Sequence, residues 1–257
     1  MSGKRIRFDK LFGAGRNAAL VAVDHGAEFG PTPGLTDFQA ALENLNGADG
    51  ILLNPGMVES SAKFFGRPGA PLMILRATWT TAYCFPFNYT ESNTCQVISA
   101  RDALAQGADF LMACCLLQTG SEAMDRDNIR LFTDIVAQKE KAGLPLIGEL
   151  FPVEAEKMPE KELHSRVCRG ARILAELGAD AVKTFYTGDR FGEVVEGAGV
   201  PVLALGASKC DEKQALDKAR KAVRAGARGV VFGRNVFQAK SPSAFLKSLV
   251  AVVHGKG

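Results

Sequence analysis

The chain has 257 residues and a formal net charge of +3, from 31 lysines and arginines against 28 aspartates and glutamates. So small an excess of positive charge gives no broad basic field, and we expect no nucleic acid partner. The longest apolar run, residues 110–117, is well short of the ~18 residues that a membrane-spanning helix needs, so no membrane association is expected.

The six cysteines form no Cys-x-x-Cys pair, and Cys114 and Cys115 are adjacent. This spacing predicts neither a disulfide framework nor a zinc site, and no metal or other cofactor is expected. A reducing cytoplasm is the expected location. Cys114 and Cys115 are interpreted as small buried apolar side chains.

Two short signatures alternate along the chain, and each precedes an apolar run. Gly-Ala-Asp or Gly-Ala-Arg occurs at residues 47–49, 107–109, 178–180 and 226–228, and Gly-x-Pro at 69–71, 143–145 and 199–201. With an opening run they predict eight strands at residues 19–24, 50–53, 72–77, 110–114, 146–150, 181–183, 202–205 and 229–232. These runs do not alternate with polar residues, as expected for strands covered on both faces.

Helical patterns fill the gaps between these strands. Residues 160–177 carry one apolar stripe, residues 122–141 follow Ser121 as a cap, and residues 212–225 follow a capping box of Asp211 and Gln214, with a stripe of Leu216, Ala219 and Val223. Alternating strands and helices predict an α/β fold, a single (β/α)8 TIM barrel over residues 1–257 with an N-terminal lead-in at 1–18. The alternative is an open doubly wound sheet, whose glycine-rich fingerprint is missing after the first strand.

In such a barrel the chemistry gathers where the strands end. Lys183 lies inside the apolar run of the sixth strand. Burial favours the neutral amine of a lysine, which can attack a carbonyl carbon and form a Schiff base. The alternative is a lysine whose charged end reaches solvent.

Glycine-containing loops follow the seventh and eighth strands, and together they predict a phosphate site. Their candidate contacts are Gly206, Ser208, Lys209, Gly233 and Arg234. Carboxylates for proton transfer are available at Asp24 and Glu149. Asp24 could instead form a cap or turn, and Glu149 a salt bridge to Lys183 or Arg76. His25 is expected to be a structural hydrogen bonder, and His164 and His254 to lie on the surface.

Four motifs resemble the class I aldolases of the archaeal-type fructose-bisphosphate aldolase family, within the DeoC/LacD superfamily, which includes members acting on autoinducer-2 phosphate. They are Val-Asp-His-Gly at residues 23–26, Val-Lys-Thr-x-Tyr-Thr-Gly at 182–188, Gly-Ala-Ser-Lys at 206–209 and Gly-Arg-Asn-Val-Phe-Gln at 233–238. The resemblance implies a Schiff-base role for Lys183, a catalytic carboxylate at Asp24, phosphate contacts at Ser208, Lys209, Gly233 and Arg234, and a homo-oligomer.

The chain departs from this family after the fifth strand. Where the fructose-bisphosphate members resemble Trp-Ser-Tyr-Pro, with a tyrosine as the acid/base, this chain has Glu-Leu-Phe-Pro at residues 149–152. Phe151 cannot transfer a proton. Because strand alternation sends Glu149 to the same side as Phe151, we expect Glu149 to take over the proton transfer. Tyr186 is the other candidate.

The sequence thus predicts a metal-independent class I aldolase that acts on a phosphorylated ketone or sugar phosphate. One alternative is thiolase-like acyl transfer from a phosphorylated diketone to coenzyme A. Another is a sugar-phosphate isomerase or binding barrel without a Schiff base. Residues 78–94 form a long aromatic loop, which is expected to act as a lid or an oligomer contact.

Overall fold

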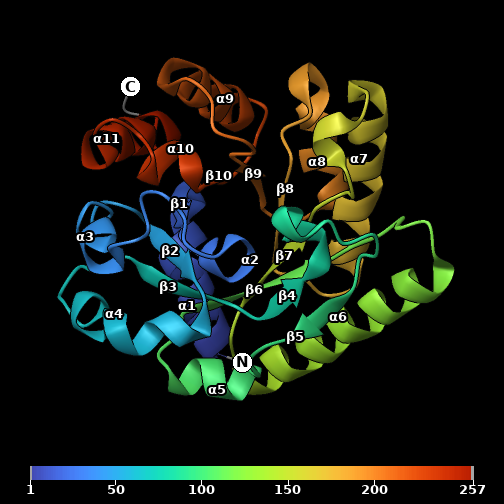
Figure 1. Cartoon of the computed structure of the whole chain (residues 1–257), viewed down its shortest axis with the longest axis horizontal. Coiled ribbons are helices and arrows are strands. Elements are labelled where there is room, and N and C mark those ends of the chain that lie inside the picture. Colours follow the sequence, from blue (N-terminus) through green and yellow to red (C-terminus); the bar gives the residue numbers. More distant parts are fainter. Residues whose placement is uncertain (1, 256–257) are drawn as a thin grey trace.

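The fold is a closed barrel of parallel strands in the order β1-β2-β3-β6-β7-β8-β9-β10, seen in the computed structural model of residues 2–255 (Figure 1). The strands are β1 (Ala18–Ala22), β2 (Gly50–Leu53), β3 (Leu72–Arg76), β6 (Phe110–Cys115), β7 (Leu146–Leu150), β8 (Ala181–Thr184), β9 (Val202–Leu205) and β10 (Gly229–Phe232). The predicted (β/α)8 barrel is confirmed, and the doubly wound alternative is wrong. Within the described residues, no helix has the length and apolar character of a membrane span.

Helices surround the barrel (Figure 1). They are α1 (Ser2–Phe12), α2 (Gly26–Phe29), α3 (Phe38–Glu43), α4 (Val58–Phe65), α5 (Ala100–Ala105), α6 (Glu122–Ala142), α7 (Glu160–Glu176), α8 (Phe191–Ala198), α9 (Glu212–Arg224), α10 (Arg234–Phe237) and α11 (Pro242–Val253). The side chain of Ser121 caps α6 as predicted, and Gly143 ends it with φ of +67°. Asp211 caps α9 by accepting a hydrogen bond from the N–H of Lys213.

The apolar stripe predicted for α9 is displaced. The fully buried side chains of this helix are Ala215, Ala219 and Ala222, while Leu216 and Val223 are only half-buried on its flank. The face of α9 that turns inward, next to β10, therefore carries small side chains, and the longer apolar side chains lie beside it.

Strand alternation fills the barrel interior and then builds the site. One residue per strand forms an apolar layer, namely Leu20, Leu52, Ile74, Met112, Ile147, Ala181, Leu203 and Val231. Leu11 and Phe12 of α1 belong to the same cluster, so the described part of the lead-in packs against this layer. Two residues further along β3, β7 and β8, the inward positions are Arg76, Glu149 and Lys183. The packed layer therefore forms the floor beneath charged side chains.

Residues 78–94 are more regular than an extended loop. Thr78–Thr80 (β4) and Thr94–Gln96 (β5) pair as an antiparallel ribbon, joined by two short turns of 3₁₀ helix. Tyr83 is buried in this segment, here named the β4–β5 excursion, whereas Phe85 and Phe87 are more than half exposed. Phe85 stacks on Phe29 with ring centroids 5.9 Å apart. The lid and the oligomer contact both stay predictions.

Candidate active site

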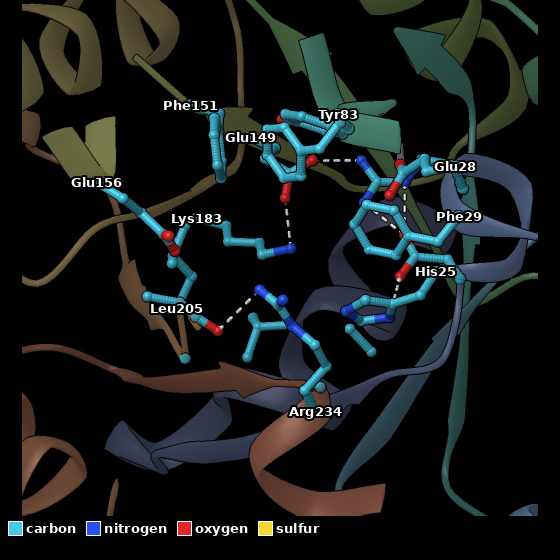
Figure 2. Close-up of a pocket in the computed structure, with 18 residues that line it drawn as sticks. His25, Glu28, Phe29, Tyr83, Glu149, Phe151, Glu156, Lys183, Leu205 and Arg234 are labelled. Carbon is cyan, nitrogen blue, oxygen red and sulfur yellow. Dashed lines mark hydrogen bonds and ion pairs between the residues drawn. The ribbon is translucent and has the colours of Figure 1, made fainter. Parts of the chain in front are cut away.

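Four charged side chains meet at the carboxyl ends of β1, β3, β7 and β8 (Figure 2). They are Asp24, Arg76, Glu149 and Lys183, and each has 6% or less of its surface exposed. All four line one pocket, together with Gly206, Gly233 and Arg234. The structure therefore brings the predicted lysine and both predicted carboxylates together, and it contradicts the alternative of a lysine turned out to solvent.

Glu149 bridges two cations at the centre of this cluster. One of its oxygens contacts a guanidinium nitrogen of Arg76, and the other contacts Nζ of Lys183. The β7–β8 register places Glu149 directly beside Lys183. Arg76 also donates from Nε to Oδ2 of Asp24 over 2.7 Å. Two buried carboxylates thus face two buried cations, which offsets the cost of burying each charge.

These ion pairs set the protonation of both carboxyl groups. Burial by itself would raise the pKa of Glu149, but the charges of Arg76 and Lys183 lower it to about 2. Burial likewise opposes the ionisation of Asp24, and Arg76 is the main charge that lowers its pKa below the ordinary value. Both groups are ionised at neutral pH. Each can accept a proton when a neighbouring positive charge is lost.

The surroundings of His25 differ from the expected hydrogen-bonding role. Its Nδ1 lies 3.7 Å from a carboxylate oxygen of Asp24 and, within residues 2–255, has no hydrogen-bond partner. Its ring packs edge-on against Phe237, with centroids 5.2 Å apart, and over Gly233. A Cβ at residue 233 would come within 2.4 Å of this ring, so the glycine makes room for the histidine. Burial lowers the pKa of His25 to about 4 and keeps it neutral.

Residues 206–209, part of the predicted phosphate site and here named the anion loop after that prediction, are held in place by Asn235. Its side-chain nitrogen donates to the carbonyl of Gly206 over 3.1 Å, and its oxygen accepts from the N–H of Cys210 over 2.9 Å. Arg234 reaches from the next strand end into the pocket and donates to the carbonyl of Ala207 over 3.4 Å (Figure 2). A positive side chain thus borders the loop on its pocket side, as anion binding requires.

Two predicted phosphate contacts, Ser208 and Lys209, lie outside the lining of the pocket. The N–H and the hydroxyl of Ser208 both donate hydrogen bonds to a carboxylate oxygen of Glu156, over 3.1 Å and 2.7 Å. Lys209 is exposed and donates to the carbonyl of Gln238 over 2.5 Å. Neither side chain lines the pocket in this conformation, whereas Glu156 does. A carboxylate therefore occupies the donors that the sequence assigns to a phosphate.

Tyr186 does not replace the missing tyrosine of the family. Its ring packs on Phe191, with centroids 5.2 Å apart, and does not line the pocket. Tyr83 of the β4–β5 excursion takes a position near Phe151 instead, with ring centroids 4.7 Å apart and its hydroxyl 3.0 Å from the sulfur of Cys114. Burial raises the pKa of Tyr83 well above its ordinary value, so its hydroxyl keeps its proton.

The expectation that His164 and His254 lie on the surface is wrong. His164 is buried in α7, with Nδ1 2.9 Å from the hydroxyl of Thr187. His254 is half-buried, and its Nε2 lies 2.8 Å from a carboxylate oxygen of Asp49. Both imidazoles connect parts of the fold. The buried, apolar interpretation of Cys114 and Cys115 is confirmed.

A parallel barrel with a lysine buried at the carboxyl ends of its strands is the arrangement expected of a Schiff-base enzyme. Residues 18–239 match the model of the DeoC/LacD family aldolases, so the chain belongs to this family and is an aldolase. The family predicted from the motifs is confirmed.

Curated relatives agree with this assignment over nearly the whole chain. An uncharacterised aldolase of Saccharolobus solfataricus is 30% identical over 99% of this chain and 95% of its own. A 2-amino-3,7-dideoxy-D-threo-hept-6-ulosonate synthase of Halobacterium salinarum is also 30% identical, over 98% and 92%. A 3-hydroxy-5-phosphonooxypentane-2,4-dione thiolase of Photorhabdus laumondii is 29% identical, over 98% and 82%.

Solved structures show the same similarity. The crystal structure of an archaeal fructose 1,6-bisphosphate aldolase has a TM-score of 0.81 and 28% identity, covering 98% of this chain and 99% of its own. A second archaeal structure, with its catalytic lysine covalently bound to the carbinolamine intermediate of the substrate, also has a TM-score of 0.81, with 27% identity over 98% and 100%.

Proposed function

We propose that this aldolase uses Lys183 as its Schiff-base lysine and acts on a phosphorylated ketone. The observation that carries the proposal is the position of Nζ of Lys183, buried beside Glu149 in a pocket that Gly206 and Arg234 also line. A ketone with its phosphate at Arg234 and the anion loop would present its carbonyl carbon to that nitrogen.

The first chemical step needs a neutral amine at Lys183. Glu149 contacts Nζ and accepts its proton, so that the nitrogen attacks the carbonyl carbon and gives a carbinolamine. Glu149 returns that proton to the carbinolamine hydroxyl, which leaves as water, and the nitrogen becomes an iminium. The positive charge of Lys183 is one of the two charges that lower the pKa of Glu149. When Lys183 loses its proton this charge disappears, so the pKa of Glu149 rises and the carboxyl can hold the proton that it has accepted.

The iminium then acts as the electron sink for carbon–carbon cleavage. A base takes the proton of the hydroxyl on the carbon beyond the scissile bond, the bond electrons move to the iminium, and an aldehyde leaves an enamine behind. Protonation of the enamine and addition of water release the ketone and restore the amine. Glu149 and Asp24 are the carboxylates within the pocket for these transfers.

Borohydride reduction tests the nucleophile directly. Wild-type protein treated with dihydroxyacetone phosphate and borohydride is expected to gain the mass of the reduced adduct on the peptide that contains Lys183. An adduct on another lysine, or none with a panel of phosphorylated ketones, would contradict the proposal and favour a barrel that binds sugar phosphates without a Schiff base. The thiolase alternative predicts acetyl-CoA formation that depends on added coenzyme A.

Replacing Glu149 by glutamine is expected to lower kcat by about 10²–10⁴-fold, the usual contribution of a general acid/base. The amide keeps the shape of the side chain but cannot accept the proton of Lys183. The matched control is Glu154→Gln on the connection that follows β7, where an exposed carboxylate pairs with Lys157. Steady-state turnover checks both variants. Glu149→Gln within twofold of wild type would remove Glu149 from the proton path.

Glu156 is expected to compete with the substrate phosphate for Ser208. Glu156→Gln should strengthen inhibition by inorganic phosphate about three- to tenfold, because a like charge at contact distance costs ~1 kcal/mol in water. Ser208→Ala removes the hydroxyl donor and should shift the inhibition constant the other way. Unchanged inhibition in Glu156→Gln would show that phosphate binds elsewhere.

A further inference from the structure

Glu28 is a buried carboxyl group of the pocket that the proposed reaction does not use. It lies on α2, only 8% of the residue is exposed, and it lines the pocket together with Asp24 and Arg76 (Figure 2). The ion pairs of the pocket join other residues, and among residues 2–255 no side chain or backbone group pairs with the carboxyl of Glu28. With no protein partner among these residues, the carboxyl borders the open space of the pocket, where an oxygen of a substrate can reach it.

The charges around Glu28 decide its protonation. Arg76 and Lys183 already pair with Asp24 and Glu149, and among residues 2–255 no ion pair joins Glu28 to a cation. Burial, followed by the charge of Asp24, raises the pKa of Glu28 to about 8. At neutral pH the group is a carboxylic acid with one O–H to donate. The ionisable groups whose charges interact with it are Asp24, Arg76, Cys84, Glu149 and Lys183. The other ionisable groups that line the pocket are His25, Tyr83, Glu156 and Arg234.

The place of Glu28 relative to the anion loop indicates which part of a substrate it meets. Figure 2 shows Lys183 between Glu28 on one side and Glu156 with Leu205 on the other. With the phosphate at the anion loop and the carbonyl at Lys183, the remaining half of the substrate extends toward Glu28. Trp79 fixes this side by donating to the carbonyl of Ala27 over 2.9 Å.

We propose that Glu28 donates a hydrogen bond from its protonated carboxyl to an uncharged oxygen in the half of the substrate that is released as the aldehyde. The inference rests on the proposed function, since it takes the ketone carbonyl to be at Lys183. It makes Glu28 a specificity-determining residue for an aldehyde without a phosphate. A second phosphate would face the carboxylates of Asp24 and Glu149 and the apolar rings of Phe29 and Phe85.

Kinetics of Glu28→Leu and Glu28→Gln test the proposal. Leucine removes the donor at similar size, and glutamine keeps a donor that cannot ionise. With dihydroxyacetone phosphate as the donor ketone, Glu28→Leu is expected to lower kcat/KM for glyceraldehyde by about 10–100-fold. It should leave the rate of borohydride trapping within twofold, because trapping needs only the ketone. Wild type should use glyceraldehyde at least tenfold better than glyceraldehyde 3-phosphate.

The outcomes separate the two proposals. No adduct in wild type would refute the Schiff-base function itself. An adduct in wild type with undiminished aldehyde turnover in Glu28→Leu would overturn the role of Glu28. An equal loss of trapping and turnover in Glu28→Leu would mark a structural role and would also overturn it. A wild-type preference for the phosphorylated aldehyde would overturn the inference of an uncharged acceptor.

The pH dependence gives a readout that does not involve activity. Between pH 5 and 8 the carboxyl of residue 28 is ionised in the unfolded chain and protonated in the folded protein, so folding takes up a proton and is progressively disfavoured as the pH rises. The urea midpoint of wild type should therefore fall with pH relative to Glu28→Gln. Glu59→Gln, at an exposed position of α4, should run parallel to wild type. Parallel curves for Glu28→Gln and wild type would show an ionised Glu28 and overturn the proposal.

Discussion

Replacing Lys183 by methionine is expected to lower kcat by at least about 10⁴-fold, the scale of loss seen when a nucleophile is removed. Methionine keeps the length and the apolar body of the side chain but has no amine, so no iminium can form. Borohydride trapping with dihydroxyacetone phosphate should disappear together with turnover. Glu149 loses one of the two charges that lower its pKa, so that pKa is expected to rise toward its ordinary value.

Lys139 offers a matched control for this variant. It is also a buried lysine, 1% exposed, and its Nζ pairs with Asp180 over 2.6 Å and Glu140 over 2.7 Å, away from the pocket. Lys139→Met should keep the adduct on the peptide that contains residue 183, at reduced stability. Residual trapping in Lys183→Met on any other lysine would contradict the assignment.

Much of the central site follows from strand position alone. The apolar runs fix where β7 and β8 end, and the two-residue alternation of a strand fixes that Glu149 and Lys183 point inward. Parallel register then brings them side by side. The ion pair between them was thus predictable as one of two interpretations of Glu149, the other being a chemical role.

Other parts of the site carry no periodic signal. Glu28 lies on a helix of four residues, too short for an amphipathic pattern. It is a candidate site residue because it is buried at the pocket and has no protein partner among residues 2–255, and neither property can be read from the sequence. Glu156 and Tyr83 reach the pocket from connections whose path depends on the tertiary fold. Aromatic content at residues 78–94 suggested a role for that segment, but not which ring would face the site.

Arg76 can be almost completely buried because Asp24 and Glu149 offset its charge. The same ion pairs predict how much stability is lost when Arg76 is replaced. Arg76→Met leaves Asp24 and Glu149 with Lys183 as their one cation within the ion-pair cluster. Breaking a buried ion pair in this way costs about 3–5 kcal/mol of unfolding free energy. The loss should appear at pH 7.5 in urea unfolding. The matched control is Arg67→Met, since Arg67 pairs with Glu43 at the surface over 2.5 Å and such pairs contribute about 0–1 kcal/mol.

Glu149 should contribute to the pH dependence of stability with opposite signs in the two proteins. In wild type the pKa of Glu149 is about 2, below its value of 4.5 in the unfolded chain, so its ion pairs stabilise the fold above pH 4.5 and lose this effect as the pH falls toward 2. In Arg76→Met, burial without the guanidinium should raise the pKa of a carboxyl above the unfolded value. Protonation then restores stability, and the unfolding free energy should increase from pH 7.5 to pH 5 by more than in wild type, where Glu28 already contributes an increase. An Arg76→Met protein whose unfolding free energy increases no more than that of wild type over this range would show that another cation compensates the two carboxylates.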